Sequence, residues 1–186
     1  MSARSLIPVL VAVVLAGCGD GPKGSSGESD GPIPFIGRDA KQVVSAFGAD
    51  GRDVLEAPDR MTLFTLNPVQ VADGKLSPEA ERLRNYGVLG KAEITDPTIR
   101  RRLVEAVYEG LKADGAGPAN CFFPRHGLRF EKGEQTIEVL ICFECTWVYV
   151  YPDGAENETR LLFSAGVKPV FDSVIKPLKL KQDQPK

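Results

Sequence analysis

The chain has little of what several protein classes require. It carries one histidine among 186 residues and a formal net charge of only −2. The absence of a positive excess argues against a nucleic-acid partner, which calls for a basic face. No P-loop, GxGxxG, GxSxG or HExxH motif occurs. The sequence therefore lacks the common signatures of phosphate binding, dinucleotide binding, hydrolysis and zinc proteolysis.

Long apolar runs are also missing, apart from one near the start. Arg4 precedes the run Leu6–Ala16, which is too short to span a bilayer but suits the apolar region of a secretory signal. Residues 15–18 then read LAGC. This motif resembles the lipobox of bacterial lipoproteins. The resemblance implies cleavage before Cys18, a diacylglyceryl group on its sulfur and a fatty acid such as palmitate on the new amino terminus.

These features predict three segments. Residues 1–17 form the lipoprotein signal peptide, and residues 18–34 form the lipidated Cys18 with a Gly/Ser/Pro tether that has too little apolar content to fold. Residues 35–186 form a single domain of ordinary size. We expect the protein in the bacterial cell envelope, anchored to a membrane by its lipid, with the domain facing the periplasm or the exterior.

Apolar periodicity and turn signals predict an α+β fold, an antiparallel β-meander sheet with helices packed on one face. The clearest helix begins at Pro97, with Asp96 as its N-cap, and ends at Gly115. The other expected elements are helices at 39–48, from 77 and at 167–176, and strands at 61–71, 86–95, 125–131, 135–151 and 159–164.

The expected strand 135–151 decides how its two cysteines face. Odd-numbered residues from Ile137 to Tyr151 are all apolar or aromatic apart from Cys145, and they form the main core face. Cys142 points to the other face. Residues three apart in a strand are about 10 Å apart, whereas a disulfide needs Cα atoms within about 7 Å. Cys142 and Cys145 can therefore bond only if a bulge or turn interrupts the strand.

The preceding hairpin provides a different partner for Cys142. A two-residue turn at Lys132-Gly133 would pair His126 with Val139 and place His126 on the core face. Cys121 would then lie toward the mixed face with Cys142. This register favours a Cys121–Cys142 disulfide, with Cys145 as a buried free thiol. An extracytoplasmic location permits such a bond.

The cysteines belong to a longer pattern. Residues 121–127 read CFFPRHG, residues 142–145 read CFEC, and residues 168–172 read KPVFD. These motifs resemble a group of uncharacterised bacterial proteins with a CxxPRHG…CFEC pattern and a PxPVFD-like helix near the end. This chain departs from that pattern at Lys168-Pro169, where a Gln-Pro pair is common. The resemblance implies no catalytic residues.

Two classes of function remain open. The first is a membrane-tethered extracytoplasmic binding or structural module without catalysis, cofactor or nucleic acid, whose partner would be an envelope component or a protein. The second is a zinc-binding or thiol-redox protein. The zinc ligand set would be Cys121, His126, Cys142 and Cys145, although strand parity opposes it. The redox reading meets the objection that reactive CxxC motifs sit at helix N-termini, not within strands.

Overall fold

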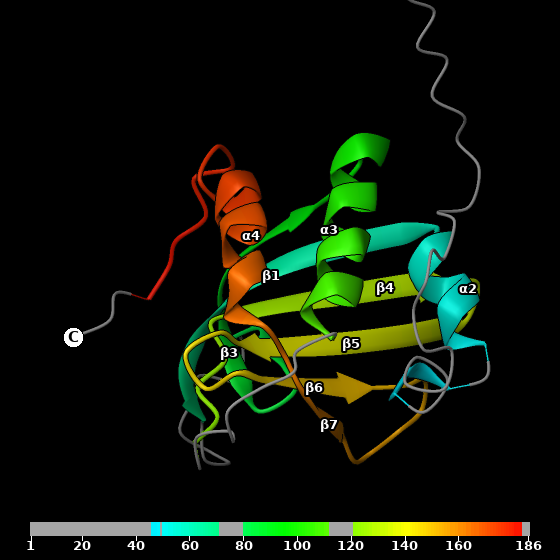
Figure 1. Ribbon diagram of the computed structural model, residues 1–186, viewed down its shortest axis with the longest axis horizontal. Coiled ribbons are helices and arrows are strands. Elements are labelled where there is room, and N and C mark those ends of the chain that lie inside the picture. Colours follow the sequence, from blue (N-terminus) through cyan, green and yellow to red (C-terminus); the bar gives the residue numbers. More distant parts are fainter. Residues whose placement is uncertain (1–45, 49, 71–79, 112–120, 184–186) are drawn as a thin grey trace, which may run out of the picture.

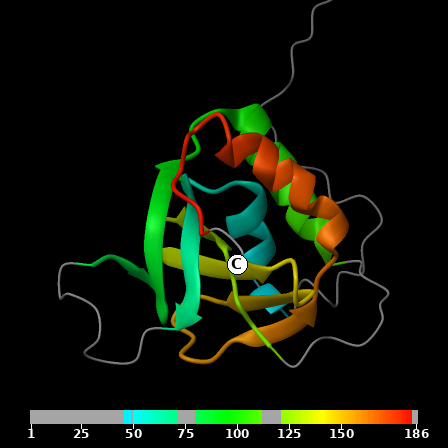
Figure 2. The same cartoon turned by 90° about the vertical axis from the view of Figure 1, so that its left-hand side faces the viewer.

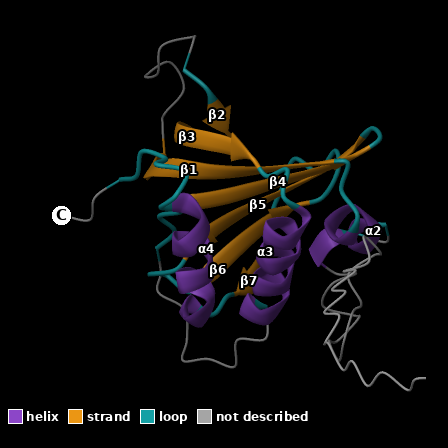
Figure 3. Cartoon of the chain, turned by 90° about the horizontal axis from the view of Figure 1, so that it is seen from above, coloured by secondary structure: helices purple, strands orange, loops and turns teal. Residues whose placement is uncertain are grey.

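A computed structural model describes residues 46–48, 50–70, 80–111 and 121–183 of the chain. It contains a seven-stranded antiparallel sheet with strand order β2-β3-β1-β4-β5-β6-β7. Three helices lie on one face of this sheet (Figures 1 and 3). The α+β class and the antiparallel meander with helices on one face are therefore confirmed, although the meander has four strands where the sequence predicted three.

The elements run in the following order along the chain. They are α2 (Gly51–Glu56), β1 (Arg60–Gln70), β2 (Arg82–Leu83), β3 (Tyr86–Glu93), α3 (Pro97–Gly110), β4 (His126–Lys132), β5 (Gln135–Cys142), β6 (Trp147–Tyr151), β7 (Thr159–Leu162), the 3₁₀ turn Ala165–Val167 and α4 (Lys168–Ile175).

The main core lies between the sheet and the helices. Its strand residues alternate along β5, where Ile137, Val139 and Ile141 belong to this core and Ile137 lies beside Gly51 of α2. The sheet is strongly curled, so that the strands at the β3 end turn away from those at the β7 end (Figure 2). The curl lets one face of the sheet wrap around the helices that cover it.

The opposite face of the sheet carries a second, smaller core. Its buried members are Phe64, Leu66, Leu83, Tyr86, Leu140 and Tyr151. Leu140 belongs to it while its neighbours Val139 and Ile141 belong to the main core, as strand alternation requires. The segment that leads into β4 packs on this side through Phe122.

Most of the expected elements are observed within one or two residues of their predicted bounds. Asp96 caps α3 by accepting hydrogen bonds from the backbone N–H groups of Thr98 and Ile99. The short helix α2 was not expected from the sequence. The expected segments at 1–17 and 18–34, including Cys18, lie outside the described residues. The helix expected from 77 is not observed from residue 80 onward, where β2 forms instead, and residues 77–79 are outside the described ranges. The helix α3 ends at Gly110, before the expected end at Gly115. Of the helix expected at 39–48, Ala46 and Phe47 are helical.

Two expectations about the meander are wrong. The strand expected at 135–151 is interrupted at residues 143–146 by a turn, after which β6 folds back against β5. The β4–β5 register is displaced by two residues, because the turn residues are Gly133 and Glu134 and His126 pairs with Ile141. Gly133 has φ +55°, and glycine at the first central position is typical of type II′ hairpins. An even displacement preserves the face of every side chain.

None of the helices in the described ranges combines the length and the hydropathy that crossing a membrane requires.

Candidate functional site

The turn at residues 143–146 creates the site. β5 ends at Cys142 and β6 begins at Trp147, its partner across the hairpin. Thr146 adopts φ +55°, a conformation that few residues other than glycine adopt. Its hydroxyl donates to the carbonyl of Cys145 at 2.8 Å. The chain can therefore reverse within the CFEC motif, which the expected continuous strand did not allow.

This reversal brings Cys142 and Cys145 together, so the disulfide differs from the one expected. The bond joins Cys142 to Cys145, whose Cα atoms are 5.3 Å apart, within the range that a disulfide requires. The expected Cys121–Cys142 bond and the expected free thiol at Cys145 are thus both wrong. The parity argument separated Cys142 from Cys145 by assuming a regular strand, and the turn removes that condition.

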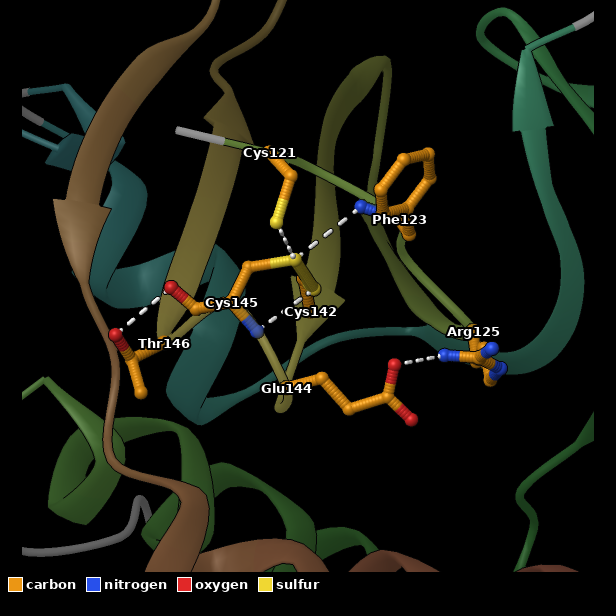
Figure 4. The surroundings of a disulfide bond; sticks show 7 residues. All are labelled: Cys121, Phe123, Arg125, Cys142, Glu144, Cys145 and Thr146. Atoms are coloured by element: carbon orange, nitrogen blue, oxygen red, sulfur yellow. Dashed lines mark hydrogen bonds and ion pairs between the residues drawn. A yellow bond between two sulfur atoms is a disulfide. The ribbon is translucent and has the colours of Figure 1, made fainter. Parts of the chain in front are cut away.

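Cys121 carries the free thiol and lies against the disulfide. Its Sγ is 3.4 Å from Sγ of Cys145. The backbone N–H of Phe123 also donates to Cys145 Sγ at 3.4 Å, and the N–H of Cys145 donates to Cys142 Sγ at 3.1 Å. Figure 4 shows the three sulfur atoms gathered at one place, with Cys121 facing Cys145. We call Cys121, Cys142 and Cys145 the sulfur site.

The three cysteines of the sulfur site differ in how exposed they are. Cys142 and Cys145 are each 1% exposed, whereas Cys121 is only half-buried. The ring of Phe123, two residues along, is 48% exposed. The free thiol is therefore the most accessible of the three sulfur-bearing residues.

The segment that carries Cys121 is held on the sheet by aromatic packing. The ring of Phe122 stacks on Tyr149 of β6 with centroids 3.5 Å apart, and Tyr86 of β3 meets it edge-on at 6.2 Å. Arg125 fixes the end of the segment nearest β4, because it pairs with Glu144 in the turn and with Asp183 at 3.3 Å. The contacts of Phe122 and Arg125, which both follow Cys121 in the chain, therefore hold Cys121 against the turn.

His126 lies on the opposite face of the sheet from Cys142. It pairs with Ile141, a residue of the main core, and its ring meets Phe171 of α4 at 6.1 Å. Burial is the largest cause that lowers the pKa of His126 to about 4, and the charge of Lys168 lowers it further. The expected placement of His126 on the core face is confirmed.

The structure thus brings together three of the four residues of the expected zinc set. Cys121, Cys142 and Cys145 converge, while His126 packs among aromatic rings on the helix side of the sheet. Over the described ranges, no group of three or more histidine, cysteine or acidic side chains has an arrangement that would hold a metal ion.

Comparison with known proteins gives no further guidance. Neither a family model, nor a curated protein, nor a solved structure matches the chain.

The turn in CFEC was not predicted, because both faces of the expected strand are apolar beyond residue 146. Trp147, Tyr149 and Tyr151 continue the odd-numbered face, while Val148 and Val150 lie on the even-numbered face. In the structure, the main core takes odd-numbered residues from β5, ending with Ile141, but takes Val148 and Val150 from β6. Since a regular strand cannot change parity, this change is a consequence of the turn between residues 142 and 147.

Proposed function

We propose that the protein is a membrane-tethered extracytoplasmic module whose sulfur site exchanges disulfides with thiols of a partner. The tether is the lipidated Cys18 and the polar segment after it, which the LAGC motif supports. The domain would then meet its partners in a compartment where disulfides persist.

The observation that carries this proposal is the contact between Cys121 Sγ and Cys145 Sγ at 3.4 Å. Thiol–disulfide exchange begins when a thiolate attacks a sulfur of a disulfide. Reacting atoms about 3–3.5 Å apart are close to the geometry of attack. A free thiol at this distance from a disulfide places both reactants of an exchange in one site.

The CFEC turn removes the strand-parity objection to a disulfide within the CxxC pair. A CxxC pair in mid-strand cannot close and reopen a disulfide without distorting the sheet. Here the pair lies in a turn between β5 and β6, where the bond closes over a short loop at the end of the ladder. The bond lies beside the last β5–β6 pair, that of Cys142 with Trp147, and not within the ladder.

The overall reaction with a partner dithiol is balanced. Two partner thiolates attack in succession, first forming a mixed disulfide with the module and then closing the partner's own disulfide. Cys142 and Cys145 end as thiols, so the module gains the two electrons and two protons that the partner loses. The reverse reaction would reduce a partner disulfide.

A purely structural role for the disulfide is the competing function, and it matches the binding or structural module expected from the sequence. The burial of Cys142 and Cys145, each 1% exposed, favours it, because a structural disulfide is protected from external thiols. The decisive question is whether the bond reacts while the domain stays folded.

Native-state reduction answers this question. The full chain with Cys18→Ser is treated with dithiothreitol, quenched with an alkylating reagent and weighed by mass spectrometry, while circular dichroism follows the fold. We expect one alkyl group on the denatured chain before treatment and three afterwards, with the fold retained. The Cys142→Ser/Cys145→Ser double variant, which has no disulfide in the site, is the control.

Reduction that occurs only in denaturant would overturn the proposal in favour of the structural module. A zinc ion retained in the native mass of the reduced chain would instead support the metal-binding alternative.

A further inference from the structure

We propose that the sulfur site exists as two disulfide isomers that share Cys145. In one isomer Cys145 is bonded to Cys142 and Cys121 is free; in the other Cys145 is bonded to Cys121 and Cys142 is free. This inference rests on the proposed exchange function and assigns a separate role to each sulfur.

The contacts of Cys121 identify the sulfur that it attacks. Its Sγ touches Sγ of Cys145 at 3.4 Å, and Figure 4 shows Cys121 facing that sulfur. A thiolate attacks the disulfide sulfur that it meets, and the other sulfur of the bond leaves. Cys121 is therefore the nucleophile, Cys145 the central sulfur and Cys142 the leaving group.

A hydrogen-bond donor already faces the leaving sulfur. The backbone N–H of Cys145 points at Cys142 Sγ, with the two atoms 3.1 Å apart. Hydrogen bonds to a charged acceptor are stronger than those to a neutral one. As negative charge develops on Cys142, this N–H stabilises it without rearrangement of the backbone.

The exchange is balanced without any outside reagent. The bond between Sγ of Cys121 and Sγ of Cys145 forms as the bond between Cys145 and Cys142 breaks. The electron pair of the broken bond passes to Cys142. Cys121 loses its thiol proton to solvent and Cys142 takes one up, so nothing is oxidised or reduced overall.

The isomerisation would make a buried disulfide accessible. Both sulfur-bearing residues of the Cys142–Cys145 bond are 1% exposed, so an external thiol meets little of it. The second isomer includes Cys121, which is half-buried. A partner thiolate would then attack Cys121 Sγ, form a mixed disulfide there and release Cys145. The substrate class is thus a thiol presented at the surface next to Cys121.

Single serine substitutions in the full chain with Cys18→Ser test the order of the sulfurs. After denaturation in alkylating reagent without reductant, peptide masses show which cysteines were bonded. We expect a Cys142–Cys145 bond in Cys121→Ser, a Cys121–Cys145 bond in Cys142→Ser, and two free thiols in Cys145→Ser. A Cys121–Cys142 bond in Cys145→Ser, or two free thiols in Cys142→Ser, overturns the inference.

A kinetic measurement covers the case in which a variant fails to fold. Cys121→Ser keeps the observed disulfide, and we expect dithiothreitol to reduce it at least about tenfold more slowly than the parent chain, because the intramolecular path is lost. Equal rates would overturn the isomerisation while leaving the exchange function standing. Failure of the parent chain itself to be reduced in the native state would count against the proposed function instead.

Discussion

The ring of His126 meets the ring of Phe143 edge to face, with the two centroids 5.1 Å apart. Phe143 belongs to the CFEC turn, so this contact joins the turn to the main core while the disulfide lies toward the other face. Neither ring nitrogen of His126 has a hydrogen-bond partner among the described residues. Within that part of the chain, the His126 ring makes aromatic packing contacts with Phe143 and Phe171 on the main-core face of the sheet.

This burial predicts an acid-sensitive fold. The folded-state pKa of His126 is about 4, below its ordinary value of 6.5, chiefly because burial disfavours the charged ring. The charges of Lys168 and Arg125 lower this pKa further, and Asp172 opposes them. The unfolded chain therefore binds the proton more readily between these values. The stability that neutral His126 contributes is fully present above pH 6.5. It is lost as the pH falls toward 4, which lowers the free energy of unfolding by up to about 3 kcal/mol.

Urea unfolding at a series of pH values measures this decline. His126→Gln cannot titrate in this range and is the matched control, because it should flatten the profile between pH 6.5 and pH 4 even if its absolute stability is lower. A parent chain as stable at pH 4.5 as at pH 7 would contradict the prediction.

The N-cap of α3 predicts a local contribution to stability. The carboxylate of Asp96 accepts from the N–H groups of Thr98 at 2.8 Å and Ile99 at 3.2 Å. Asp96→Ala removes the oxygen that accepts both hydrogen bonds and should lower the free energy of unfolding by about 1 kcal/mol. Asp96→Asn, which keeps a cap acceptor, should cost much less. Equal losses for the two variants in thermal or urea unfolding would show that the cap contributes nothing.

Close packing at Gly110 predicts that alanine at this position destabilises the domain, although alanine has a higher helix propensity than glycine. Alanine normally favours a helix over glycine by about 1 kcal/mol. At Gly110, however, an added Cβ would lie 2.2 Å from ring atoms of Phe163, a residue that is fully buried. Gly110→Ala should therefore destabilise the domain by about 1–3 kcal/mol.

A double-mutant cycle isolates this clash. Phe163→Leu shortens the side chain that the new methyl group would meet, so Gly110→Ala should cost less in the Phe163→Leu background than in the parent chain. Additive losses would show that the ring of Phe163 is not responsible.

The lipid anchor predicts where the protein partitions. Cys18→Ser removes the sulfur that the LAGC motif marks for lipidation, and acyl chains stabilise membrane attachment by about 0.8 kcal/mol for each buried CH₂ group. We expect the variant to lose the fatty-acid mass and the detergent-phase partitioning of the parent chain. Cys121→Ser is the control that should retain both. Unchanged partitioning of Cys18→Ser would contradict the lipoprotein assignment.

Much of the architecture followed from local pattern. Asp96 and Pro97 marked the start of α3, and the β-rich stretch after Met61 marked β1, because caps and strand formers act through neighbouring residues. The face of His126 was also predicted correctly, since a register error of two residues preserves parity. For the same reason, the two-residue error in the β4–β5 register left unchanged which face of the sheet was expected to pack against the helices.

The sequence by itself determined the α+β class, the meander and the clustering of chemistry in the CFFPRHG and CFEC motifs. Only the tertiary structure decided which sulfurs meet. Phe143 and Glu144 have no turn preference of their own. The chain reverses between Cys142 and Trp147 because Val148 and Val150 then pack into the main core with residues distant in the chain. Because that reversal depends on contacts between segments distant in the chain, local propensity predicted a straight strand where the disulfide forms.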